Sequence, residues 1–341
     1  MPERIGENRL KMDAIKVENL TKKFGDNTAV DNISFTIAEK EIFGLLGPNG
    51  AGKTTTLSIL ATMLAPSSGE AYVNGFPVTK EQDSVRKSIG IVFQDQSLDE
   101  ELTAYENMDF HGRLYRIQKD VREKRIKTLL ELVELYDRKD SIVKTFSGGM
   151  RRRLEIARGL LHEPKVLFLD EPTLGLDPQT RNHLWEYIEK LNKEKGITII
   201  LTTHYMEEAD KLCGRVAIID KGKIIAMNSP EELKDEIGGD VITIKSPYND
   251  KLYALIKDMA GIKHSETHDG KITISLPNAE ERVMEIAGLA TKNGLSISSL
   301  SISKPTLEDV FLHFTGRNIR EQEANGGDNM RMFQRARMGG R

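Results

Sequence analysis

Residues 47–55 read GPNGAGKTT and fit the pattern G-x-x-x-x-G-K-[ST] of a loop that binds phosphate groups. The apolar run EIFGLLG precedes the loop and TTTLSILATML follows it, so the sequence predicts a buried strand, a glycine-rich loop and a helix in that order. Glycines let the backbone point its N–H groups at a triphosphate, and the helix adds the positive end of its dipole. The predicted nucleotide-binding residues of this loop are Gly47, Pro48, Asn49, Gly50, Ala51, Gly52, Lys53, Thr54 and Thr55.

Two carboxylates follow a second apolar run, VLFLDEPT at residues 166–173. They lie at the carboxyl end of a predicted buried strand, where ligands bind in α/β sheets. We expect Asp170, with the Thr54 hydroxyl, to hold Mg²⁺, and Glu171 to orient the attacking water as general base, while Lys53 reaches the β- and γ-phosphates. Taken alone, the acid pair could be a helix cap and a surface acid, but the phosphate loop before it favours the catalytic interpretation.

The composition is that of a soluble globular protein, with 341 residues, 38% hydrophobic, 30% charged, and a net charge of -3. The near-neutral balance gives no electrostatic argument for nucleic acid as a partner. The single cysteine, Cys213, excludes an intrachain disulfide and favours a reducing compartment. No apolar run approaches the ~18 residues that would span a bilayer, so a transport role would require a partner that supplies the membrane path.

The sequence predicts an α/β nucleotide-binding domain followed by a small α+β domain. Gly238–Gly239 interrupts the first pattern, and the second then runs strand, helix, strand, helix, strand, an order that could form a ferredoxin-like unit. One strand of that fold is not evident near His264. The expected divisions are a flexible leader over 1–13, a nucleotide-binding domain over 14–239 with a helical subdomain over about 95–162, an accessory domain over 240–317 and a mobile tail over 318–341.

A third motif, FSGGMRRRLEIARGLLHEP at residues 146–164, lies between the phosphate loop and LFLDEPTLGLDP at residues 167–178. Together the three motifs closely resemble the nucleotide-binding domains of ABC transporters, which are P-loop NTPases. The resemblance implies two copies paired head to tail, with Ser147, Gly148 and Gly149 of one copy contacting the γ-phosphate bound to the other. A serine and glycine amides at a helix N-terminus form an anion site, which agrees with that role.

Other positions can be matched to the same family one at a time. Gln94 matches the glutamine that contacts Mg²⁺ and water and faces the transmembrane subunit, and Asp177 matches an aspartate at the dimer interface. His204, at the end of ITIILTTH, matches the histidine that hydrogen-bonds the γ-phosphate. Phe24 matches the aromatic residue that stacks on adenine, although tyrosine is commoner there and a core phenylalanine is the alternative. The family also implies a coupling surface in the loop after Gln94 and in the helix with Glu106, unless that segment is an ordinary solvated one.

Two features indicate one branch of the family. Met150 replaces the usual signature glutamine, and SGGMRRRLEIA resembles the ATPases of drug and antibiotic exporters of the daunorubicin-resistance type. The segment KPTLEDVFLHFTGR, residues 304–317, resembles the closing motif of that branch. The resemblance implies an ATP- and Mg²⁺-dependent motor at the cytoplasmic face of the membrane, paired with a second copy of itself and with a separate permease of the type-two class.

Rival interpretations and open points remain at this stage. Translation factors of this class normally carry two nucleotide-binding domains and repair ATPases carry a long coiled coil, whereas this chain has one phosphate loop and no sustained heptads. An importer ATPase is a second alternative. The C-terminal domain could regulate turnover, stabilise the dimer or contact the permease, and the arginines of the tail could touch anionic lipid or be solvated. The sequence does not indicate the transported substrate, because an ATPase subunit need not contact it.

Overall fold

The computed structural model describes residues 13–316 except 269 and 278. The chain divides between Ile224 and Ile225 into two compact units, which are described separately. The boundary predicted at Gly238–Gly239 lies inside the second unit. The predicted leader, apart from Asp13 at the start of the first strand, and the predicted tail lie outside the described residues.

A six-stranded sheet forms the centre of the first unit, and its apolar strands explain why it is buried. Three central strands are buried at every residue, as expected for a parallel sheet that is covered on both faces. The hairpin predicted at DKGK is present, with Lys221 and Gly222 both in the left-handed region at φ 48° and 80°. The order is β10 (Lys223–Asn228), β9 (Arg215–Asp220), β3 (Ile42–Leu46), β8 (Thr198–Thr203), β7 (Val166–Asp170) and β6 (Ile89–Val92).

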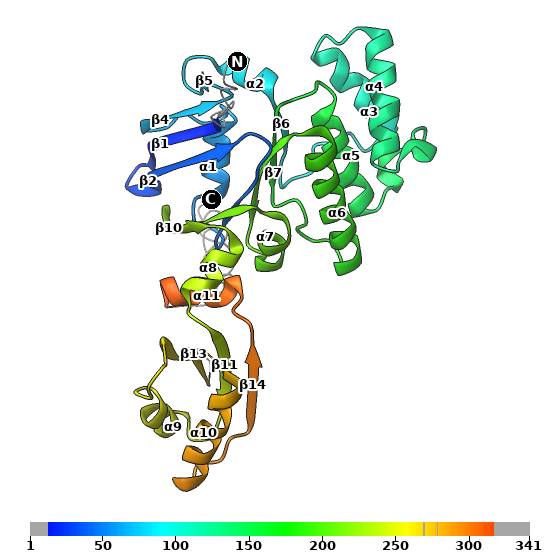
Figure 1. Ribbon diagram of the computed structural model, residues 1–341. Helices are drawn as coiled ribbons and strands as arrows, with labels where there is room; N and C mark the ends of the chain where they lie inside the picture. Colours follow the sequence, from blue (N-terminus) through cyan, green and yellow to red (C-terminus); the bar gives the residue numbers. More distant parts are fainter. Residues whose placement is uncertain (1–12, 269, 278, 317–341) are drawn as a thin grey trace, which may run out of the picture. The chain divides into compact units, whose positions relative to one another are not determined.

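A second, antiparallel sheet lies on the other side of the first helix, α1 (Lys53–Leu60), which contacts strands of both sheets. Figure 1 shows β1, β2 and β4 beside α1. The sequence predicted that α1 would continue towards Pro66, but it ends at Leu60 because Thr62 takes a left-handed conformation at φ 62°. The sheet order is β2 (Asn27–Ala38), β1 (Asp13–Phe24), β4 (Ser68–Val73) and β5 (Phe76–Pro77).

Helices α3, α4, α5 and α6 gather beside β6 and β7 (Figure 1), whereas α2 contacts β5 and β6, and α7 contacts α6, β3 and β8. α5 packs against β6, α3, α4 and α6, so it joins the helical stretch to the sheet. Among the described residues, no helix combines the length and the apolar character that crossing a membrane requires. The helices are α2 (Gln82–Ser88), α3 (Ala104–Leu114), α4 (Lys119–Leu132), α5 (Gly148–Leu160), α6 (Pro178–Lys195) and α7 (Met206–Leu212).

The second unit contains a four-stranded antiparallel sheet in the order β12, β13, β11, β14. Together with α9 (Asn249–Ile256) and α10 (Ala279–Lys292) it has the βαββαβ order of a ferredoxin-like fold, as the sequence suggested. The strand that the sequence did not reveal, β12 (His264–His268), lies at the sheet edge and carries no apolar pattern. The other strands are β11 (Asp240–Lys245), β13 (Lys271–Leu276) and β14 (Ser299–Ser303), and α8 (Pro230–Glu236) contacts α11 (Leu307–Thr315).

One buried carboxyl group links three segments of the first unit. Glu208 of α7 is fully buried, and its Oε1 accepts hydrogen bonds from Thr173 Oγ1 at 2.8 Å and from Trp185 Nε1 at 3.0 Å. Burial raises the pKa of Glu208, although these hydrogen bonds oppose the rise. The folded protein therefore keeps this carboxyl protonated at pH values where an unfolded chain would release the proton.

This raised pKa predicts a pH-dependent stability that Glu208→Gln should remove. As pH rises from the ordinary glutamate pKa through the raised value, the unfolded state binds fewer protons than the folded state, so the free energy of unfolding of the wild type falls. The amide does not titrate and should show no such fall. Urea unfolding, followed by the fluorescence of Trp185, the only tryptophan of the chain, checks this across pH. A wild type–variant difference that stays constant with pH would contradict the prediction.

Candidate functional site

The predicted catalytic residues meet because four neighbouring parallel strands end at one edge of the central sheet. β3 leads into the phosphate loop, β8 into His204, β7 into Glu171, and β6 into the bend that contains Gln94. Strands β3, β8 and β7 are adjacent, and the phosphate loop is tied to β8 by a hydrogen bond from Gly47 N to Thr203 O at 3.2 Å. Such an edge is where ligands bind in α/β sheets.

The phosphate loop takes a conformation that requires glycine. Gly50 and Gly52 have φ values of 80° and 106°, and a Cβ on Gly52 would lie 2.3 Å from the carbonyl oxygen of Ala29. Lys53 begins α1 and is only 4% exposed. Its Nζ donates to the carbonyl oxygens of Gly47 at 2.7 Å and of Pro48 at 3.1 Å, so the cation lies within the curve of the loop.

Lys53, Glu171 and His204 lie together at the centre of the site. Glu171 Oε1 lies 3.5 Å from Lys53 Nζ and 3.2 Å from His204 Nδ1. Burial works to raise the pKa of Glu171, but the hydrogen bond with His204 and the charge of Lys53 outweigh it and lower the pKa below the usual value. The carboxylate is therefore ionised at neutral pH and can accept a hydrogen bond from a water molecule.

The backbone of Glu171 is held in an uncommon conformation. Its φ of 46° lies in the left-handed region, which is uncommon for a residue that carries a Cβ. Its N–H donates to both the carbonyl oxygen and the hydroxyl of Thr202, each at 3.1 Å. The Thr202 hydroxyl also donates to Asp170 Oδ1. Sequence analysis missed Thr202, and its place two residues before His204 at the end of a strand was the available signal.

The oxygen atoms that were predicted to hold a divalent cation lie together. Thr54 Oγ1 is 3.1 Å from Asp170 Oδ1, and a hydroxyl beside a carboxylate suits Mg²⁺, which prefers oxygen ligands and commonly shares them with substrate phosphates. Gln94 is exposed two residues after the end of β6. Together with the Lys53 ammonium group in the loop and the N-terminus of α1, these residues fit a bound nucleoside triphosphate and its Mg²⁺.

Phe24 lies at the end of β1, in the second sheet. The residue is 49% exposed, so the alternative of a core phenylalanine is excluded. The ammonium group of Lys22 lies 5.0 Å from the ring centroid. The exposed ring offers a surface on which a flat base could stack.

The signature residues lie at the start of α5. Ser147 is exposed and caps the helix, accepting a hydrogen bond from Met150 N at 3.3 Å, and Gly148 is exposed beside it. Gly149 is buried against α6, where an added Cβ would lie 2.3 Å from Thr180 Cγ2. The first turn of α5 therefore packs directly on the first turn of α6.

Asp177 caps that first turn of α6. Its carboxylate accepts hydrogen bonds from Thr180 Oγ1 at 2.6 Å and from Thr180 N at 3.0 Å, and these bonds lower its pKa. Through Thr180, the structure brings Asp177 and Gly149 together. Asp177 caps α6 and Gly149 belongs to α5, whereas Lys53 belongs to α1.

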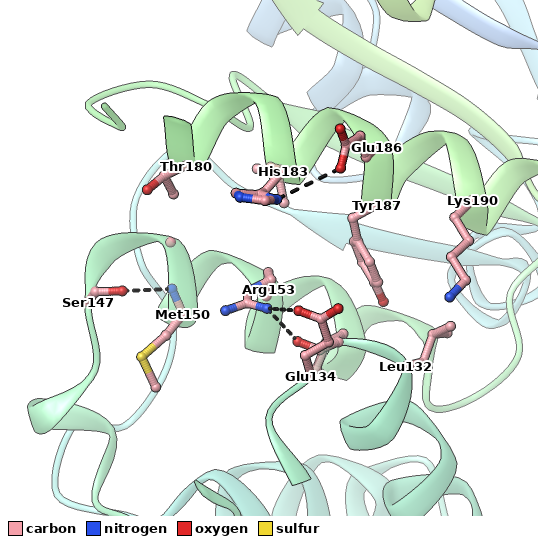
Figure 2. A pocket seen from close by; sticks show the side chains of 13 residues that line it. Leu132, Glu134, Ser147, Met150, Arg153, Thr180, His183, Glu186, Tyr187 and Lys190 are labelled. Atoms are coloured by element: carbon pink, nitrogen blue, oxygen red, sulfur yellow. Dashed lines mark hydrogen bonds and ion pairs between the residues drawn. The ribbon is translucent and has the colours of Figure 1, made fainter. Parts of the chain in front are cut away.

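A cavity of about 370 Å³ lies beside these two helices (Figure 2). Ser147, Gly149 and Thr180 contribute to its wall, and Arg153 forms an ion pair with Glu134 at 3.2 Å there. Residues 47–55 do not line it, so it is separate from the phosphate loop.

Comparison with known proteins assigns both parts of the chain. Residues 30–174 match the ABC transporter family, and residues 229–315 match the C-terminal domain of the DrrA1-3-like ATP-binding proteins. The linearmycin resistance ATP-binding protein LnrL of Bacillus subtilis is 40% identical over 311 residues, covering 90% of this chain and 100% of that protein. The daunorubicin resistance ATP-binding protein DrrA3 of Streptomyces coeruleorubidus is 38% identical, covering 91% and 98%. The Nod factor export ATP-binding protein I of Ralstonia nicotianae is 39% identical, covering 90% and 95%.

Solved structures agree with this assignment. CbiO1 of Clostridium perfringens, part of the ABC transporter complex cbiONQ, is 33% identical with a TM-score of 0.61, over 65% of this chain and 90% of that one. The ATP-binding cassette MJ0796, solved as a dimer bound to ADP and Pi, is 30% identical with a TM-score of 0.56, over 63% and 98%. The match to the DrrA-like C-terminal domain and the similarity to the resistance proteins confirm the resemblance to the daunorubicin-resistance branch. The chain belongs to the ATP-binding proteins of ABC transporters, P-loop ATPases that bind and hydrolyse ATP, and within them to the group that carries a DrrA-like C-terminal domain.

Proposed function

We propose that this ATPase is the motor subunit of an exporter and that it drives transport through a separate transmembrane permease. The observation that carries the proposal is the similarity, over about nine tenths of the chain, to ATP-binding proteins named for linearmycin resistance, daunorubicin resistance and Nod factor export. Drug or antibiotic efflux is the favoured role. All three names indicate outward transport. Because the named compounds differ, they do not specify one substrate.

The proposed working unit is a head-to-tail dimer of two copies with two ATP molecules between them. Ser147 and Gly148 support it, because they are exposed at the N-terminus of a thirteen-residue helix, where N–H groups favour an anion. The dimeric cassette MJ0796, in a post-hydrolysis state with ADP and Pi, supplies a related assembly. In this arrangement Asp177 lies at the dimer interface. Binding of ATP favours the closed pair, and hydrolysis favours opening, which the permease converts into transport.

The roles proposed for the phosphate-binding residues follow from charge and position. Lys53, together with Ser147 of the opposite copy, stabilises the charge that develops on the γ-phosphate. Thr54 and Asp170 would hold Mg²⁺, with Gln94 as a further contact. When bound, Mg²⁺ neutralises charge on the phosphate oxygens.

The remaining roles concern the attacking water and the base of the nucleotide. Glu171 accepts a hydrogen bond from the water and orients it, a role that suits a carboxylate whose pKa is lowered. His204 Nδ1 lies 3.2 Å from Glu171 Oε1, and His204 is proposed to contact the γ-phosphate. Phe24 stacks on adenine.

The proposed coupling surface is the exposed part of α3 and the loop that follows Gln94. Phe110 and Leu114, one helical turn apart on α3, are 60% and 64% exposed, which suits contact with an apolar partner. Asn107 is buried instead and braces the loop, accepting from Asp99 N and donating to Asp99 O, each at 2.9 Å. Docking at this surface would hold the chain at the cytoplasmic face of the membrane.

The role of Glu171 predicts that Glu171→Gln binds ATP but barely hydrolyses it. Loss of a group that orients and polarises the water should lower kcat by about 10²–10⁴-fold and trap the ATP-bound dimer. Steady-state phosphate release and size-exclusion chromatography with ATP measure the two effects. Glu131→Gln, a change at a half-exposed position of α4, is the control and should behave as the wild type. Normal turnover of Glu171→Gln would show that the base assignment is wrong.

The transporter role predicts a membrane partner. Glu171→Gln, expressed in its native host and extracted from membranes in mild detergent with ATP, should copurify with a stoichiometric polytopic protein. Adding Phe110→Ser and Leu114→Ser should abolish the association and leave ATP binding intact. A chain that stays in the soluble fraction, alone or with ribosomes or DNA, would refute the transporter proposal and leave only the ATPase. A solute-binding protein in the complex would favour the import alternative.

A further inference from the structure

Arg152, to which sequence analysis assigned no role, contacts the backbone that carries the catalytic carboxylates. It lies in α5, and its side chain is only 8% exposed. Nε donates to the carbonyl oxygen of Pro172 at 2.9 Å, and Nη2 donates to those of Asp170 at 2.8 Å and Glu171 at 3.2 Å. One guanidinium group therefore binds three consecutive carbonyl groups just where β7 ends.

The same guanidinium group also reaches the segment that contains Gln94. Nη1 donates to the carbonyl oxygen of Phe93 and to Glu155 Oε2, the latter at 3.0 Å. With these two bonds, all five N–H donors of the side chain have acceptors. Glu155 is itself buried, and its other carboxylate oxygen accepts from Ser97 N at 2.8 Å. The Arg152–Glu155 pair thus holds the segment 93–97 at both ends, with Gln94 between them.

Arg152 and Thr202 restrain different backbone groups of Glu171. The left-handed conformation of Glu171 is costly, by about 1–3 kcal/mol for such residues, and persists only where the surroundings impose it. Thr202 fixes the N–H of Glu171 and Arg152 fixes its carbonyl group, so both peptide groups that flank its Cα are anchored. Displacement of either anchor would move the carboxylate away from Lys53 and His204.

We propose that Arg152 is a positioning residue for ATP hydrolysis. It keeps the Glu171 carboxylate and the segment that contains Gln94 in fixed positions relative to each other. The proposal rests on the function proposed above for Glu171. Because Arg152 and Ser147 belong to the same helix, the contact also links the surface that meets the opposite ATP to the carboxylate of the local site. Lysine would keep the positive charge beside Glu155, but its single ammonium group cannot satisfy five acceptors in a fixed plane.

The test compares Arg152→Lys and Arg152→Gln with the wild type in the full-length chain. We expect kcat to fall by about 10- to 100-fold, as for a displaced catalytic group, with the lysine variant retaining more activity than the glutamine variant. KM and the dissociation constant of a fluorescent ATP analogue should stay at wild-type values. Arg153→Lys is the matched control, because Arg153 is the next residue of α5 and its side chain contacts Val133 and Glu134 instead.

Each outcome bears on the proposal. Unchanged kcat in Arg152→Lys would overturn it, as would a loss of kcat accompanied by an equal loss of ATP affinity, which a merely structural role predicts. If Arg152→Gln does not fold, Arg152→Lys alone decides the matter. Glu171→Gln, measured in parallel, separates a failure of the positioning role of Arg152 from a failure of the role proposed for Glu171. A slow Glu171→Gln with a normal Arg152→Lys refutes only the positioning role, whereas a fast Glu171→Gln refutes the proposed role of Glu171.

Discussion

Lys53, Glu171 and His204 meet in a place with little access to water, where a charge is costly unless an opposite charge or a hydrogen bond compensates it. The Glu171 carboxylate lies within 3.5 Å of both of the other side chains, and Lys53 also donates to the carbonyl oxygens of Gly47 and Pro48. The cluster can form only if the phosphate loop and the ends of β7 and β8 approach within hydrogen-bond distance. The buried parallel sheet provides that approach, because it brings residues separated by more than a hundred positions in the chain to one edge.

The surroundings of this cluster also limit how the site can move. Thr202 bonds to the backbone of Glu171 and to the side chain of Asp170, so the carboxylates proposed for catalysis and for metal binding share one neighbour. On the other side, α5 and α6 pack with almost no space at Gly149 and Thr180. The signature turn and the turn capped by Asp177 are therefore expected to move together. A displacement of this helix pair would reach the Glu171 backbone through α5.

Much of the fold and the centre of the site could be predicted from the sequence, because their signals are local. A glycine-rich loop between a strand and a helix, an acid pair after an apolar run and a histidine that ends one each lie within a few residues. Contacts between distant segments carry no such local signal, so Thr202 and Arg152 were missed. β12 escaped detection because its five residues, HSETH, contain no apolar side chain. The early end of α1 depends on the backbone angle of Thr62, which TTTLSILATML does not reveal.

The buried Arg152–Glu155 pair has a consequence for how such chains can diverge and be recombined. Loss of either residue alone leaves the other as a buried charge without its partner. Evolution is therefore expected to replace the two residues together or nearly so. The pair also touches three separate stretches of sequence, at Phe93–Ser97, in α5 and at Asp170–Pro172. A chimera that exchanges the helical region between two relatives should therefore take all three stretches from the same parent.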